Sequence, residues 1–127
     1  MGFSSGGYSS LYASLLLPCS GYVGFSLLTD LSKGSPIDPG PFFPAKSRDS
    51  TDDAYLINLR DLADATNDRV KRLIFFGADS AIDTAHAKNM EGVPNLRTIK
   101  VGKSGHDTVA ALIERRKFYN CVRDLLF

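Results

Sequence analysis

The sequence has few of the features that assign a small chain to a special class. Its two cysteines, Cys19 and Cys121, have no metal-binding or redox spacing, and we expect reduced thiols in a cytoplasmic protein, with a disulfide as the alternative. The net charge of +1 gives no reason to expect a nucleic-acid partner. We expect no secretory signal, because no charged segment precedes an apolar one. The apolar stretch Leu11–Leu17 is too short to span a membrane.

The composition is that of an ordinary folded domain. The chain has 127 residues, of which 43% are hydrophobic and 23% charged, so we expect one domain over residues 1–127. Residues 29–50 are rich in Pro, Gly and Ser and predict a loop insertion rather than a regular element. A loop of this length is usually functional or mobile, often a lid or an insertion that faces the substrate. Its aromatic pair Phe42-Phe43 either lines an acyl pocket or attaches the loop to the core, and we favour attachment.

The remaining sequence alternates between helical and strand patterns. Helical spacing of apolar residues and capping residues predict helices over Ser9–Leu17, from Ser50 onward with Asp52 and Asp53 in its first turn, over Asp83–Met90 and over Asp107–Leu126. Short apolar runs predict buried strands at Gly21–Leu28, Val70–Phe76 and Leu96–Val101. This order predicts an α/β fold of three layers, with a short, mostly parallel sheet flanked by helices.

The N-terminal sequence GFSSGG contains a G-x-S-x-G motif centred on Ser4. Such a motif forms the sharp strand-to-helix turn on which hydrolases mount a nucleophilic serine. The turn needs small residues on either side, and Gly2 and Gly6 meet this need, with Gly7 adding further freedom. The backbone N–H of Ser5 would donate to an oxyanion. The turn also needs a strand in front of it, and the sequence predicts none.

A nucleophilic serine needs a base and an acid that orients the base. His106 follows the third predicted strand in a glycine-containing loop, which suits a base. Asp79 and Asp83 follow the preceding strand, and either could be the acid, although Asp83 could also cap a helix. His86 lies within a helical pattern, so we interpret it as a surface or packing residue.

Three stretches, GFSSGGYSSLYASLL, RLIFFGADSAIDTAHAKNM and NLRTIKVGKSGHD, resemble the C-terminal half of an α/β-hydrolase superfamily protein. The resemblance implies further sheet strands and a second oxyanion donor ahead of Gly2, supplied by a missing N-terminal segment or by a partner. It also implies an acid at position 80, which is occupied by Ser80. Asp79 lies nearer the strand end, whereas Asp83 stands in a D-x-x-H-A segment similar to one in some members, so the choice stays open.

These patterns predict a serine hydrolase that cleaves an ester, thioester or similar acyl bond in a small molecule. Ser4 would attack, His106 would move the proton, and Asp79 or Asp83 would orient the imidazole. No metal or organic cofactor is implied. The alternative is an inactive fragment or pseudo-enzyme that serves as a binding or assembly module. In one form of this alternative, residues 2–7 bind an anion through backbone amides at a helix N-terminus.

Overall fold

The computed structural model describes residues 1–41, 43 and 54–126. Its centre is a sheet of four parallel strands in the order β1-β2-β3-β4. The strands are β1 (Gly2–Phe3), β2 (Tyr22–Phe25), β3 (Arg72–Gly77) and β4 (Leu96–Val101). The predicted α/β class with a parallel sheet is therefore confirmed.

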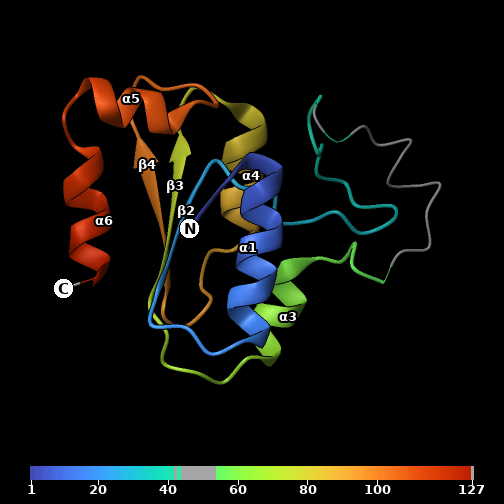
Figure 1. Ribbon diagram of the computed structural model, residues 1–127. Helices are drawn as coiled ribbons and strands as arrows, with labels where there is room; N and C mark the ends of the chain where they lie inside the picture. The colour runs from blue at the N-terminus through green and yellow to red at the C-terminus, as the bar shows by residue number, and fades with distance from the viewer. Residues whose placement is uncertain (42, 44–53, 127) are drawn as a thin grey trace.

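Helices cover both faces of the sheet and make the expected three layers (Figure 1). One face carries α1 (Ser4–Leu16), α3 (Leu59–Ala65) and α4 (Ala81–Asn89). The other face carries α5 (Thr108–Glu114) and α6 (Phe118–Leu126). In the described part of the chain, no helix has both the length and the apolar character needed to cross a membrane.

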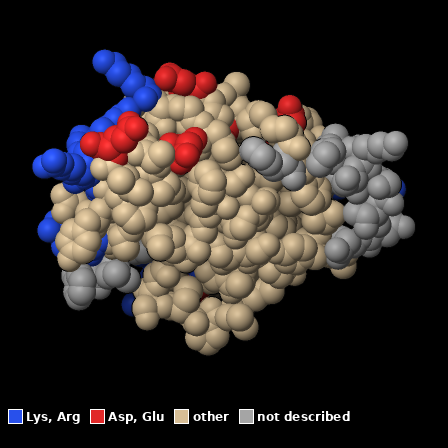
Figure 2. All heavy atoms as spheres, turned by 45° about the horizontal axis from the view of Figure 1, so that its top comes forward, with Lys and Arg blue, Asp and Glu red and all other residues tan. Residues whose placement is uncertain are grey.

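The strands end at the top of the molecule in Figure 1, and Figure 2 brings this end forward. In that view the Lys and Arg side chains gather on the side of α5 and α6. The middle of the face carries few charges. The end of the sheet at which parallel α/β proteins usually bind ligands is therefore mostly uncharged.

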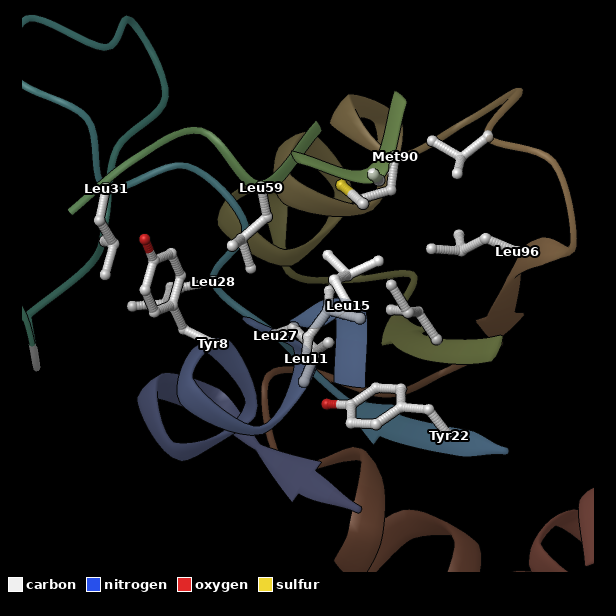
Figure 3. Close-up of a cluster of buried hydrophobic side chains, with 13 residues drawn as sticks. Tyr8, Leu11, Leu15, Tyr22, Leu27, Leu28, Leu31, Leu59, Met90 and Leu96 are labelled. Atoms are coloured by element: carbon white, nitrogen blue, oxygen red, sulfur yellow. The ribbon is translucent and has the colours of Figure 1, made fainter. Parts of the chain in front are cut away.

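Two apolar clusters lie on opposite faces of the sheet, because side chains alternate along each strand. Ile74 of β3 belongs to the larger cluster with Tyr8, Leu11 and Leu15 of α1, and Figure 3 shows these α1 side chains meeting Leu27 and Leu28. The other cluster holds side chains of β2, β3, β4 and α5: Val23, Phe25, Leu73, Phe75, Val101 and Leu112. The sheet thus gives Ser4 and the residues near it a rigid support.

The prediction that no strand precedes the serine turn is wrong. Gly2 and Phe3 form the two-residue strand β1, which pairs with β2 through Gly24 and Phe25. A strand of this length has too few residues to show an alternating pattern, so the sequence could not reveal it. It is nevertheless long enough to fix the direction in which the chain enters α1.

Two helix predictions also need correction. The predicted start at Ser50, with Asp52 and Asp53, lies outside the described residues, and α3 begins only at Leu59, where the side chain of Asn58 accepts a hydrogen bond from the N–H of Arg60. The predicted helix from Asp107 to Leu126 is divided into α5 and α6. It breaks at Arg116, which has a φ of 55°. A left-handed residue cannot continue a right-handed helix.

The first part of the predicted loop insertion is described up to Pro41, and it forms turns and bends. Phe42 lies outside the described residues, but Phe43 packs against the larger apolar cluster, as expected for a residue that attaches the loop to the core. His86 of α4 also holds this loop. Its Nδ1 accepts a hydrogen bond from the N–H of Thr29 at 3.0 Å, and its Nε2–H donates to the carbonyl of Asp38 at 2.9 Å.

Candidate active site

Ser4 lies at the turn between β1 and α1 and has an unusual backbone conformation. Its φ is 54°, in the left-handed region that non-glycine residues rarely adopt. Such a conformation costs about 1–3 kcal/mol and persists only where the surrounding structure enforces it. The same strained geometry is characteristic of a serine mounted on a strand-to-helix turn. The structure therefore supports the interpretation of the G-x-S-x-G motif as a turn that exposes Ser4.

The glycines around Ser4 differ in their packing. A Cβ on Gly2 would lie 2.6 Å from the Cα of Gly7, and a Cβ on Gly7 would lie 2.0 Å from Leu27 Cδ2. A Cβ on Gly6 would meet nothing within 4 Å. The expectation that Gly2 and Gly6 are the required small residues is thus half right. The first turn of α1 packs the Cα of Gly7 against Gly2, whereas the Cβ position of Gly6 faces open space.

Three of the predicted side chains form one hydrogen-bonded series. His106 Nε2 lies 3.0 Å from Ser4 Oγ, and His106 Nδ1 lies 2.7 Å from Asp83 Oδ1. Because a carboxylate only accepts, Nδ1–H donates to Asp83, which leaves Nε2 to accept the Ser4 hydroxyl proton. Asp83 is 1% exposed, whereas the side chain of His106 is 32% exposed. The series therefore runs from a buried carboxylate to an accessible hydroxyl.

The structure distinguishes the two acid candidates by their positions. Asp83 lies in the first turn of α4, where the partial positive charge of a helix N-terminus favours a carboxylate. Asp79 is exposed, and its backbone N–H donates to the carbonyl of Ser104. The cap of α4 is Ser80, whose Oγ accepts the N–H of Asp83, so the helix-cap alternative for Asp83 is wrong.

Sequence reasoning missed two groups that hold the loop of His106. Ser26, which follows β2 and has a φ of 52°, donates its hydroxyl to the carbonyl oxygen of His106 and lies 2.9 Å from Thr108 Oγ1. Gly77 ends β3 so close to the loop that a Cβ there would lie 1.9 Å from the carbonyl oxygen of Gly105. The positions of Ser26 and Gly77 at the ends of predicted strands could have indicated this role, because ligand-binding residues follow the carboxyl ends of parallel strands.

Two further features surround the imidazole. The ring of Phe3 lies with its centroid 5.3 Å from that of His106 and restricts the movement of the imidazole. Asp83 Oδ2 is buried and has no hydrogen-bond partner among the described residues. The hydrogen bond from His106 Nδ1 to Oδ1 is therefore the bond that offsets the cost of burying the Asp83 carboxylate. The stability of the buried carboxylate thus depends strongly on His106.

A small cavity of about 120 Å³ opens beside Ser4 and His106. Its other walls come from the chain after β2, the described part of the loop insertion and the start of α4: Leu28, Pro39, Gly40, Pro41, Ser80 and Ile82. The hydroxyl of Ser4 and the imidazole of His106 thus face a mostly apolar space in which a bound group could meet both.

Ser5, the predicted oxyanion donor, is exposed in the first turn of α1. The first four N–H groups of an α-helix have no partner within the helix, and the capping position, Phe3, makes no side-chain bond to them.

His86, the second histidine, is fully buried, so it is a packing residue and not a surface one. Burial lowers the pKa of His86 below its ordinary value, against the opposing effect of its hydrogen bond to Asp38.

Among the described residues, no group of three or more His, Cys, Asp or Glu side chains is arranged to hold a metal ion. A comparison with protein-family models gives no match to the sequence, and none of the curated proteins matches it.

Proposed function

We propose that this protein is a serine hydrolase of the α/β-hydrolase type that cleaves an ester, thioester or similar acyl bond. The observation that supports the proposal is the series Asp83 Oδ1, His106 and Ser4 Oγ, with separations of 2.7 Å and 3.0 Å. An acid, a base and a hydroxyl in this geometry are the parts that activate a serine nucleophile. The strained φ of Ser4 adds a second, independent reason to assign it this role.

In the proposed reaction, Ser4 Oγ attacks the carbonyl carbon of the substrate while His106 Nε2 takes the hydroxyl proton. The bond to the leaving group then breaks, and His106 gives the proton to the departing oxygen or sulfur. Water attacks the acyl-serine in the second half, and His106 takes a proton from it. The Ser4–acyl bond breaks, the acid is released, and the proton returns to Ser4 Oγ.

Asp83 orients the imidazole and stabilises the positive charge that forms on it. Its position in the first turn of α4 favours a negative charge beside His106 Nδ1, and its burial keeps water from competing for the hydrogen bond. The backbone N–H of Ser5 donates to the oxygen that becomes negative in the tetrahedral intermediate.

A fluorophosphonate probe tests the proposal directly, since it reacts only with an activated serine. We expect stoichiometric labelling of the folded protein, with the modification located at Ser4 by peptide mass spectrometry. Ser4→Ala should abolish labelling and reduce turnover of p-nitrophenyl acetate by about 10⁶-fold.

Ser9→Ala is the matched control, because Ser9 is an exposed serine on the same helix, and it should label as the wild type does. Labelling at Ser4 that survives in a His106→Ala variant would contradict the proposed activation. A folded protein that is not labelled would favour a non-catalytic binding or assembly module instead.

A further inference from the structure

We propose that the cavity beside Ser4 binds a short, uncharged aliphatic acyl group, and that Ile82 limits the length of this group. The proposal rests on the hydrolase function proposed above and adds its substrate class. It is drawn from the chemistry of the cavity walls, from the cavity volume and from one close approach across it.

The cavity walls are apolar apart from the groups that would perform the chemistry. Leu28, Pro39 and Ile82 contribute hydrocarbon, and Ser80 Oγ accepts a hydrogen bond from the N–H of Asp83. Among the described residues that line the cavity, none is Lys, Arg, Asp or Glu. A carboxylate or an ammonium on the acyl group would therefore lose its hydration without gaining a partner of opposite charge, which costs several kcal/mol. The acyl group must accordingly be uncharged.

The volume of the cavity limits the length of the acyl chain. The space measures about 120 Å³. A cavity of about 150 Å³ in another protein binds benzene, so this one holds about two to six carbon atoms. A longer chain would have to leave the cavity and expose its methylene groups to water, losing about 0.8 kcal/mol for each methylene not buried.

Ile82 lies opposite a rigid wall. Gly40 has a φ of 79°, and a Cβ placed on it would lie 3.6 Å from Ile82 Cδ1, so these two residues face each other. Prolines precede and follow Gly40 and restrict the backbone on both sides. The hydrogen bond from His86 to the carbonyl of Asp38 holds the same segment against α4. Since the wall cannot retreat, the side chain of Ile82 decides how far an acyl chain reaches.

The test compares kcat/KM for p-nitrophenyl acetate, butyrate, hexanoate, octanoate and decanoate. For the wild type we expect a maximum at butyrate or hexanoate and a fall of at least about tenfold by decanoate. Ile82→Ala should raise the octanoate-to-butyrate ratio about tenfold or more, and Ile82→Phe should lower the butyrate-to-acetate ratio. These ratios do not depend on how much of each variant is folded.

Leu16→Ala is the matched control. It removes the same number of carbon atoms from an exposed position at the far end of α1, and its chain-length profile should equal that of the wild type. A protein that labels at Ser4 and hydrolyses the acetate, yet has a flat profile unchanged by Ile82→Ala, would overturn the cavity assignment and leave the hydrolase proposal standing. Failure to label and to hydrolyse any ester would overturn both.

Discussion

The hydroxyl of Ser26 donates a hydrogen bond to the carbonyl oxygen of His106, eighty positions later in the chain. The turn after β2 therefore holds the loop that carries the imidazole, and Thr108 completes the contact from the start of α5. Both Ser26 and Thr108 are fully buried. The contact with Ser26 holds the backbone of His106 in place, while the hydrogen bond to Asp83 holds the imidazole ring.

Ser26→Ala should lower kcat by about 10- to 100-fold and change KM less, because a small displacement of the imidazole weakens its alignment with Ser4. Loss of the buried hydrogen bond should lower the free energy of unfolding by about 1–3 kcal/mol. The measurement is steady-state kinetics normalised to the active fraction by fluorophosphonate titration. An unchanged kcat per active site would reduce Ser26 to a purely structural role.

Asp83→Asn should lower kcat by about 10⁴-fold, since an amide at this position favours the wrong tautomer of His106. Asp79→Asn is the matched comparison, because Asp79 is exposed and its contact with the histidine loop uses its backbone N–H. We expect its kcat to stay within about twofold of the wild type. Equal losses in the two variants would contradict the assignment of the acid to Asp83.

Gly77→Ala should destabilise the protein by about 2–4 kcal/mol, because the new methyl group would collide with the carbonyl oxygens of Ser104 and Gly105. These are backbone atoms of the histidine loop, so activity should fall with stability. Gly102→Ala provides the control, since a Cβ on Gly102 meets nothing within 4 Å. Urea unfolding of both variants measures the difference, and similar stabilities would contradict the close approach.

The stability of the protein should depend on the protonation of His86. Burial lowers the pKa of His86 below its ordinary value of 6.5, although Asp30, Asp38 and Asp83 act in the opposite direction. The unfolded chain therefore binds a proton at a higher pH than the folded one. The contribution of His86 to stability should be complete above pH 6.5 and should be lost as the pH falls toward its folded pKa, by at most about 1.4 kcal/mol per pH unit.

His86→Gln removes this titration while its amide can still accept from Thr29 and donate to Asp38. Urea unfolding between pH 5 and 8 should give a smaller dependence on pH for the variant than for the wild type. The slope is the quantity compared, so a lower overall stability of His86→Gln does not affect the result. Identical slopes would contradict the proposed linkage.

Much of the fold could be predicted because the two central strands, β2 and β3, are short and mostly apolar runs that are buried throughout. The predicted strand Val70–Phe76 became β3 with small shifts at its ends, and the predicted strand Leu96–Val101 has the bounds of β4. The break between α5 and α6 could not be predicted, since Arg116 and its charged neighbours fit the exposed side of a helix equally well. The helix start expected at Ser50 lies outside the described residues, and the start of α3 at Leu59 was not predicted because its capping residue, Asn58, lies inside the same apolar stripe.

The candidate site was predictable as a set but not in its details. Ser4 and His106 stand in glycine-containing turns at strand ends, so their meeting follows from parallel topology. The identity of the acid does not follow from topology, because Asp79 and Asp83 are only four positions apart. Only the path of the chain into α4 decides which of the two faces His106. The contact of Ser26 with a carbonyl has no sequence signature, since any residue supplies that acceptor.

The hydrogen bond between Ser4 and His106 joins residues that are 102 positions apart in the chain. Ser4 follows β1 and His106 follows β4, which are the two edge strands of the sheet. Contacts of such long sequence separation form slowly, after local helices. In a refolding experiment, reactivity toward the probe should therefore return later than helical circular dichroism. The reactivity of Ser4 therefore measures completed folding, because a partly assembled sheet cannot bring His106 and Asp83 to Ser4.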